Sequence, residues 1–148
     1  LLYKYGMPEK AYEMIYTLRN HRRNEYPEAS YGMIEGITGG LMGIQPKASM
    51  NLIQTLPQLA SGEQWAEMLN LLIFNSLVDV RHEGNHKSIF VNNSEKVMKW
   101  RASFYGEYYK IYLNGKQHSP KYGVDIMGNI YSFIDVEVKQ GEKHVCNI

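Results

Sequence analysis

The sequence predicts an α+β fold, with an N-terminal helical hairpin over residues 1–46 followed by an antiparallel β-sandwich over residues 47–148. Apolar residues recur at helical spacing in the first part, and after Pro46 their period changes to two. Short polar turns then separate many short extended segments. Helices followed by a run of strands are typical of this class, and many short antiparallel strands indicate a sandwich or a barrel.

The first helix is expected to begin near Pro8, because proline is favoured in the first turn and Glu9 beside it suits the helix dipole. One apolar face follows at helical spacing: Met7, Ala11, Met14, Ile15 and Leu18.

A second helix is expected to begin at Pro27, with Glu28 in its first turn, and to end near Gly43 and Pro46. Glycine recurs every fourth residue within it, at positions 32, 36 and 40. Each such glycine costs roughly 1 kcal/mol relative to alanine, so we expect another helix backbone to approach this face closely. A membrane dimer motif has the same spacing, but Glu28 and Glu35 argue against it.

The strand region contains one clear half-buried strand, in which Met98, Trp100, Ala102 and Phe104 alternate with Lys99, Arg101 and Ser103. This alternation places Trp100 in the core. Asn114-Gly115 and Gly128-Asn129 are hairpin signals. We also expect residues 69–74 to form a buried run and Trp65 to fill the seam between the helices and the sheet.

Composition limits the function classes. The formal net charge of +1, from 16 Lys+Arg and 15 Asp+Glu, gives no reason to expect nucleic acid or a membrane as a partner. No apolar run is long enough to span a bilayer. The single cysteine, Cys146, excludes an internal disulfide and a cysteine-cluster metal site. Nucleophile elbows, phosphate loops and dinucleotide fingerprints are also absent, and we expect no cofactor.

Two histidines close in sequence, His82 and His86, flank Gly84 in an expected hairpin. A metal site there would need a third ligand, and Glu83 is the only near candidate. We interpret them as solvated hairpin residues and predict no metal.

The acidic and aromatic residues leave two kinds of sugar chemistry open. Glu25 and Glu28 could lie at the mouth of a helical barrel, although carboxylates at a helix end are the simpler interpretation. The 12 tyrosines could form a surface that stacks on sugar rings, although core and edge packing is the expected role for most of them.

The segment Tyr26-Pro27-Glu28-Ala29-Ser30-Tyr31-Gly32, with Gly39-Gly40-Leu41-Met42-Gly43-Ile44-Gln45-Pro46, resembles the end of the catalytic barrel in six-hairpin glycosidases, especially α-L-rhamnosidase-like proteins. In that family a final inner helix closes an (α/α)6 barrel, and a Gly-Ile-x-Pro turn leads into a C-terminal β-sandwich. Asn114-Gly115, after Ile111-Tyr112-Leu113, resembles a strand and turn that recur in such sandwiches.

The resemblance implies that residues 1–46 are the terminal helices of such a barrel and residues 47–148 its C-terminal sandwich domain. Its acid and base belong to earlier hairpins, so no catalytic residue is assigned here. Family members often carry Asn-His-Tyr near the start of the last inner helix as part of the sugar site, where this chain has Asn24-Glu25-Tyr26. Candidate substrate-binding residues are therefore Glu25, Tyr26 and Glu28.

We accordingly predict the non-catalytic C-terminal portion of a bacterial glycoside hydrolase, which packs against and shields the missing catalytic barrel. The chain opens Leu1-Leu2-Tyr3, which we interpret as the interior of a longer polypeptide; a small protein that has lost its initiator Met is the alternative. The resemblance implies a periplasmic or extracellular location, and uncovered helices would allow a homodimer. A free-standing carbohydrate-binding or adhesion module is the alternative function, and a complete small enzyme is a more distant one.

Overall fold

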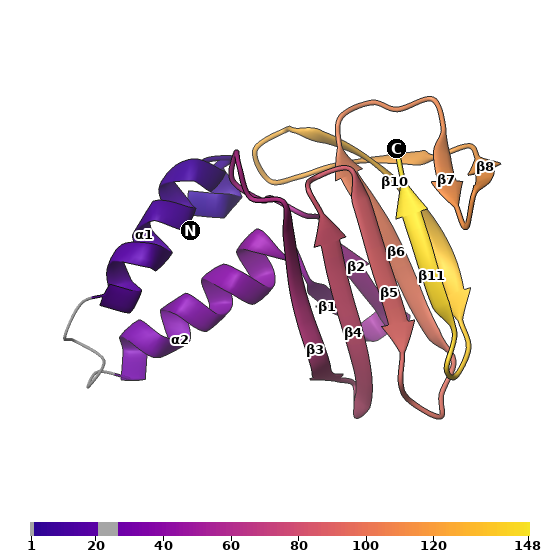
Figure 1. The fold of residues 1–148 in the computed structure, drawn as a ribbon. Helices are drawn as coiled ribbons and strands as arrows, with labels where there is room; N and C mark the ends of the chain where they lie inside the picture. The colour runs from indigo at the N-terminus through magenta and orange to yellow at the C-terminus, as the bar shows by residue number, and fades with distance from the viewer. Residues whose placement is uncertain (1, 21–26) are drawn as a thin grey trace.

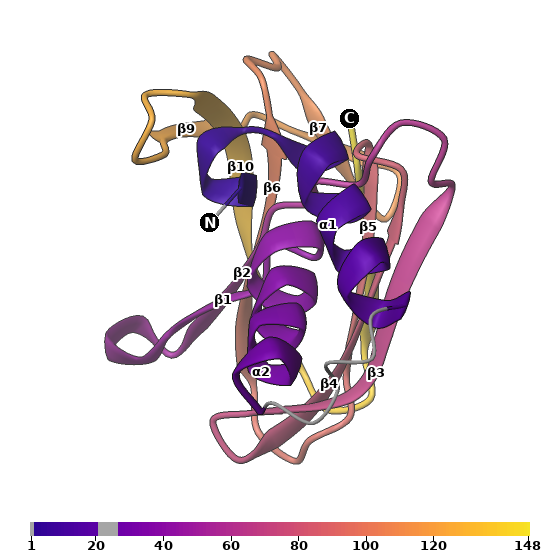
Figure 2. The same ribbon diagram turned by 90° about the vertical axis from the view of Figure 1, so that its left-hand side faces the viewer.

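The computed structural model describes residues 2–20 and 27–148 and confirms the predicted fold class (Figure 1). Two helical segments lie against one side of a sandwich of two β-sheets. Figure 2 shows that the helices lie on the side of the sandwich formed by β1 and β2 of one sheet and β3 of the other. Among the helices in the described ranges, none has both the length and the apolar character required to cross a membrane.

The helical part consists of a 3-10 turn η1 (Leu2–Tyr5), α1 (Pro8–Asn20), α2 (Pro27–Glu35) and a π-helical turn η2 (Gly36–Leu41) that continues α2 directly. Proline begins both α-helices, as predicted, because its fixed φ suits the first turn and the missing N–H has no partner there. The chain leaves η2 at Gly43, whose φ of +56° suits a residue without a side chain.

Sheet A has five strands in the order β1 (Gln45–Lys47), β2 (Leu52–Thr55), β6 (Met98–Tyr105), β10 (Ile130–Val138) and β9 (Lys121–Val124). A short 3-10 turn, η3 (Ala48–Met50), joins β1 to β2. Three of its strand pairs are antiparallel, and β2 pairs with β6 in parallel. This parallel pair departs from the antiparallel sandwich we predicted, and it arises because the chain crosses to the other sheet between the two strands.

Sheet B has six antiparallel strands in the order β3 (Trp65–Ile73), β4 (Ser76–Glu83), β5 (Lys87–Asn92), β11 (Lys143–Asn147), β7 (Ile111–Leu113) and β8 (Lys116–His118). Both predicted hairpins are confirmed. Asn114 and Gly115 join β7 to β8 with positive φ values of 49° and 77°, the backbone that a tight two-residue hairpin requires. Gly128 and Asn129 lie in the turn between β9 and β10.

The core between the two sheets is centred on Trp100, which is fully buried, as its alternation in β6 predicts. Its ring stacks on Phe90 of sheet B, with centroids 5.3 Å apart, and its Nε1 donates a hydrogen bond of 2.9 Å to Thr55 Oγ1. The buried residues Tyr3, Ala11 and Leu41 belong to the same hydrophobic cluster, so the helices extend this core.

The expected buried run at residues 69–74 is wrong. Leu69 and Leu72 are 60% and 65% exposed, because they lie on the outer face of sheet B. An irregularity between Met68 and Leu71 shifts the alternation along this strand. Trp65 is 53% exposed rather than placed at the seam, and the guanidinium of Arg81 lies over its ring at 4.6 Å.

The glycine stripe has contacts different from those we expected. A Cβ at Gly40 would lie 2.2 Å from the ring of Tyr3, and one at Gly36 would meet the side chain of Ile15 at 3.4 Å. A Cβ at Gly32 would have no neighbouring heavy atom within 4 Å. The close approach is therefore made by side chains of η1 and α1, and not by another helix backbone.

Candidate functional site

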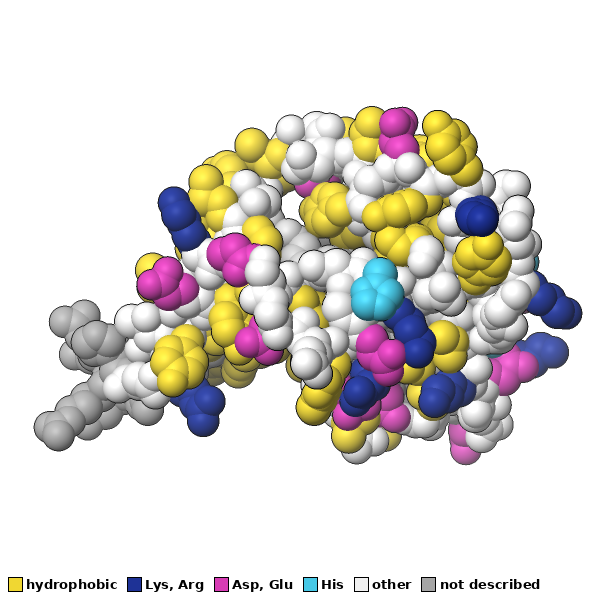
Figure 3. All heavy atoms as spheres, turned by 45° about the horizontal axis from the view of Figure 1, so that its top comes forward, with side chains coloured by type: hydrophobic (Ala, Val, Ile, Leu, Met, Phe, Trp, Pro, Cys, Tyr) yellow, Lys and Arg dark blue, Asp and Glu magenta, His cyan; other side chains and the backbone are white. Residues whose placement is uncertain are grey.

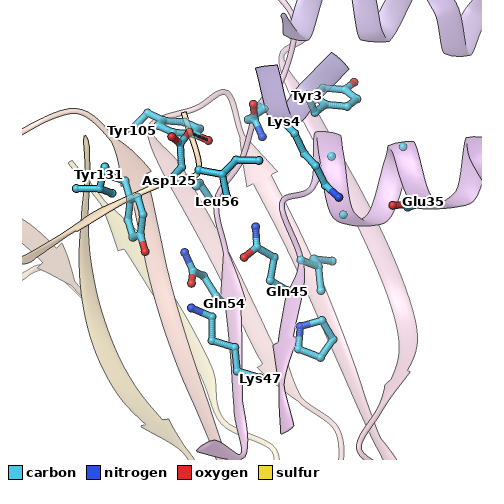
Figure 4. Close-up of a pocket in the computed structure, with 18 of the residues that line it drawn as sticks. Tyr3, Lys4, Glu35, Gln45, Lys47, Gln54, Leu56, Tyr105, Asp125 and Tyr131 are labelled. Carbon is cyan, nitrogen blue, oxygen red and sulfur yellow. Dashed lines mark hydrogen bonds between the residues drawn. The ribbon is translucent and has the colours of Figure 1, made fainter. Parts of the chain in front are cut away.

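A cavity of about 790 Å³ lies between the outer face of sheet A and the glycine-bearing face of α2 and η2. This volume falls within the roughly 300–1,000 Å³ typical of small-molecule sites. Figure 4 shows side chains from η1, β1, β2 and the loop before β10 pointing into this space.

The floor of the cavity comes from the β1–β2 hairpin. Gln45 and Gln54 are direct cross-strand partners, so their side chains share the outer face of the sheet. Lys47 lies two residues further along β1 on the same face, and its ammonium points toward Gln54 (Figure 4). Partial burial, together with the charge of Arg101, lowers the pKa of Lys47.

Gln54 is the least expected member of this floor. Its side chain is 1% exposed, and its Oε1 accepts no hydrogen bond from any residue that the structure describes. A buried amide oxygen without a partner costs about 1–3 kcal/mol, so it requires an explanation.

Two tyrosines form the wall furthest from the helices. Tyr105 on β6 and Tyr131 on β10 are cross-strand partners on the outer face. The Tyr105 hydroxyl donates a hydrogen bond of 3.1 Å to Asp125 Oδ2. Burial is the main cause that raises the pKa of this phenol, and the hydrogen bond to Asp125 is the second. Gly123 on β9 leaves room for the Tyr131 ring, because a Cβ there would lie 2.4 Å from it.

Asp125 holds the loop between β9 and β10 in shape. Its Oδ1 accepts the backbone amides of Met127 and Asn129, and its Oδ2 accepts the Asn129 side-chain amide as well as Tyr105. Burial opposes its charge, but these hydrogen bonds outweigh that effect and lower the pKa of Asp125. The carboxylate is thus an ionised structural anchor.

The wall on the helix side is formed by backbone rather than by large side chains. Gly32, Gly36, Gly39 and Gly40 all line the cavity, and a Cβ at Gly32 or Gly39 would meet no heavy atom within 4 Å. Lys4 reaches from η1 into the same region (Figure 4). The glycine stripe therefore contributes to the cavity as well as to the packing of Tyr3.

A second hollow adjoins the first above the sandwich and shares Gln58 and Tyr105 with it. In Figure 3 the surface is recessed where the helices meet the top of the sandwich. Charged side chains of both signs are intermixed on the face shown, which agrees with the near-neutral net charge.

The residues predicted to bind substrate do not form this cavity. Glu25 and Tyr26 lie outside the described residues. Glu28 is exposed in the first turn of α2 and is not among the residues that line the cavity. Glu35, two turns further along the helix, does line it.

The sequence analysis did not identify the polar residues that form the cavity: Gln45, Gln54, Gln58 and Asp125. It left the tyrosines open as a surface that stacks on sugars, but it did not place Tyr105 and Tyr131 here. One signal was present, because Gln54 is the one long polar side chain in the segment Leu52-Ile53-Gln54-Thr55-Leu56. A long amide within such a segment indicates either a core hydrogen bond or a polar site.

The interpretation of His82 as a solvated hairpin residue is wrong. Its ring is fully buried on the inner face of β4, where Nδ1 lies 2.8 Å from Ser88 Oγ and Nε2 lies 3.0 Å from the Met42 carbonyl oxygen. His86 is exposed in the turn. Within residues 2–20 and 27–148, no group of three or more His, Cys, Asp or Glu side chains is placed to hold a metal ion.

Comparison with known proteins finds no matching family model, no similar curated protein and no similar solved structure.

Proposed function

We propose that this chain is a non-catalytic C-terminal module of a bacterial glycoside hydrolase, and that its helices pack against the catalytic barrel of that enzyme. One observation carries the proposal. Both helices expose apolar side chains on surfaces that the described part of the chain does not cover: Met14, Tyr16, Tyr31, Ile34 and Ile37. Exposed apolar patches of this kind often mark protein interfaces.

The arrangement of these helices supports a helical partner. They project from one side of the sandwich, and their sandwich-facing side is already occupied by Tyr3, Ala11 and Leu41 (Figure 1). The free surface is therefore the one turned away from the sandwich, where further helices of a barrel could pack. The resemblance of residues 26–46 to the last helix of a six-hairpin glycosidase agrees with this position.

The chemistry of the cavity supports a non-catalytic role. Glycoside hydrolysis requires two carboxyl groups on opposite sides of the scissile bond, one of them usually protonated. Of the two carboxylates that line the cavity, Asp125 has both oxygens occupied: Oδ1 accepts the Met127 and Asn129 amides, and Oδ2 accepts from the Asn129 side chain and the Tyr105 hydroxyl. That leaves Glu35 without a second acid to form the pair.

The test compares the isolated chain with the product of the complete reading frame that encodes it. We expect the longer protein to hydrolyse an aryl glycoside such as an aryl rhamnoside, and the isolated chain to show no turnover. Amide hydrogen exchange over residues 8–20 and 27–35 should be slower in the longer protein, while β6 should exchange at the same rate in both.

Two outcomes would contradict the proposal. One is turnover of the glycoside by the isolated chain that disappears in a Glu28→Gln variant. The other is a longer protein in which exchange over α1 and α2 is unchanged, because a barrel packed on these helices would have to protect them.

A free-standing carbohydrate-binding or adhesion module is the alternative function. The cavity on the outer face of sheet A favours it, because it combines carboxamides with tyrosine rings. The same exchange experiment separates the two functions, since a free-standing module has no barrel to cover its helices.

A further inference from the structure

The buried carboxamide of Gln54 lines the floor of the cavity on sheet A, and its oxygen has no hydrogen-bond partner among the described residues. Replacing it with an apolar side chain of similar size would remove the cost of leaving that oxygen without a hydrogen bond. A costly polar group that faces a cavity is better explained by binding than by folding.

The groups around Gln54 define which ligand the cavity suits. Gln45 faces it across the β1–β2 pair, and Gln58 lies at the end of the cavity that joins the second hollow. A carboxamide both donates and accepts, which matches a hydroxyl group because a hydroxyl also does both. Three carboxamides in one cavity therefore suit a ligand with several hydroxyl groups.

The charges that line the cavity balance. Lys4 and Lys47 are cationic, while Glu35 and Asp125 are anionic. A strongly anionic ligand such as a phosphate ester would face two carboxylates, and a cationic ligand would face two ammonium groups. The balance favours a neutral ligand.

The tyrosine wall supplies an apolar surface of fixed orientation. The hydrogen bond to Asp125 holds the ring of Tyr105, and Gly123 provides the space that Tyr131 occupies over β9. Aromatic rings pack against the C–H faces of a sugar, which are apolar although the rim is polar. From these features we infer that the cavity binds a neutral saccharide, with Gln54 as its central hydrogen-bonding group and Tyr105 and Tyr131 as its apolar wall.

This site belongs to the described part of the chain and does not depend on the helix docking proposed above. The isolated chain is therefore the right sample. Ligand-observed NMR with the methyl glycosides of glucose, galactose, mannose, xylose, rhamnose and fucose should show saturable binding of at least one of them. Shift changes in the protein should map to β1, β2 and residues 123–131.

A Gln54→Leu variant tests the central residue. It should weaken binding by about tenfold or more, which corresponds to about 1.4 kcal/mol. Its melting temperature should equal or exceed that of the wild type, because a buried unpartnered oxygen is removed. Gln117→Leu on β8 is the matched control, since Gln117 is exposed on the other sheet, and it should leave binding unchanged.

Any of the following results would overturn the inference. The first is the absence of saturable binding for all six glycosides. The second is equal affinity of the wild type and Gln54→Leu, or shift changes that map away from β1 and β2. The third is adenosine binding more tightly than every glycoside at the same residues, because the cavity would then select a planar base and not a sugar.

Discussion

His82 on β4 connects the sandwich to the turn that follows η2. The Met42 carbonyl can only accept a hydrogen bond, so His82 Nε2 carries the proton and Nδ1 accepts from the Ser88 hydroxyl. Burial lowers the pKa of His82 to about 4, although the hydrogen bond to Met42 opposes this shift. The ring is therefore neutral at neutral pH and part of the core.

This pKa predicts a pH dependence of stability. In the unfolded state His82 binds a proton near pH 6.5, but in the folded state it does so only near pH 4. The contribution of the neutral ring to the free energy of unfolding is therefore fully present above pH 6.5, and it is lost as the pH falls from 6.5 to 4. The loss between pH 7 and pH 5 should be about 2 kcal/mol. Urea unfolding at the two pH values measures it.

A His82→Gln variant is the control for this pH effect. It should be less stable at pH 7 but should lose far less stability on acidification, because the titrating group is gone. His86→Gln, in the exposed turn, should retain the full wild-type dependence. A wild-type stability that is equal at pH 7 and pH 5 would contradict the assignment.

Trp100 is the residue whose removal should cost most. Trp100→Ala should lower the free energy of unfolding by about 3–5 kcal/mol, because it empties the space between Phe90 and Thr55. Trp65→Ala is a matched control that should cost less than about 1 kcal/mol, since Trp65 is half exposed beside Arg81. Chemical denaturation measures both. An unchanged stability in Trp100→Ala would contradict its place at the centre of the core.

Residue burial could be predicted from the sequence only where one face of a strand is exposed. Alternation along β6 identified Trp100 because Lys99 and Arg101 mark the opposite face. It could not identify Gln54, since all four residues of β2 are buried and the pattern carries no period. His82 continues the alternation of Val78 and Val80 along β4, so its burial could have been predicted. Its hydrogen bonds could not, because Met42 and Ser88 come from other elements.

At the scale of elements, α2 and η2 carry glycines with two different roles. Gly40 lies under the ring of Tyr3, whereas Gly32 borders the cavity with nothing near its Cα hydrogen. Glycine at the same helical spacing thus allows close packing at position 40 and leaves the cavity open at position 32.

This difference predicts opposite effects of one substitution. Gly40→Ala should destabilise the protein by about 1–3 kcal/mol, because the new methyl group overlaps the Tyr3 ring close to its backbone. Gly32→Ala should be neutral or stabilising by up to about 1 kcal/mol, since alanine favours the helix and meets no atom. Thermal denaturation of the two variants measures the contrast.

A double variant tests the contact itself. If the Tyr3 ring is the obstacle, Tyr3→Ala should remove most of the penalty of Gly40→Ala, which a double-mutant cycle detects as a coupling energy. Equal effects of Gly32→Ala and Gly40→Ala would show that the stripe reports helix propensity alone.

The elements that could be predicted are those fixed by local chemistry. Pro8 and Pro27 begin helices and Asn114-Gly115 forms a hairpin, because each constrains its own backbone. The exposed face of β3 and the parallel pairing of β2 with β6 depend on which strands become neighbours across the sheets. The sequence of the strand itself contains no signal for either feature.

At the scale of the molecule, the polar links between the helices and the sandwich that the described residues make include two near the loop after β2. Glu9 Oε1 accepts hydrogen bonds from the Ser61 amide and hydroxyl at 2.7 and 2.6 Å, and the Leu41 carbonyl accepts the Gln58 amide at 2.9 Å. These links position the helices beside the loop between β2 and β3. They leave the apolar surface that includes Met14 and Ile34 uncovered by the described residues.

The isolated chain should therefore self-associate through its helices or exchange amide hydrogens rapidly over residues 8–20 and 27–40 relative to β6. Association through the same patch on two copies would give a two-fold dimer. Light scattering over a range of concentrations, together with hydrogen exchange, distinguishes these outcomes. Both follow from one cause, since the apolar helix surface either finds a copy of itself or lacks the packing that slows local opening.

A competing surface has to be separated from the helices in this experiment. Leu69 and Leu72 are exposed on the edge strand β3, and such an edge can also pair with a second copy. Met14→Lys with Ile34→Lys should abolish any dimer, whereas Leu69→Lys with Leu72→Lys should leave it intact. The reverse result would assign the association to β3. A strictly monomeric chain in which residues 8–20 and 27–40 are as protected as β6 would mean that the helices already have their full partner within this chain, and the proposed barrel would have no surface left to cover.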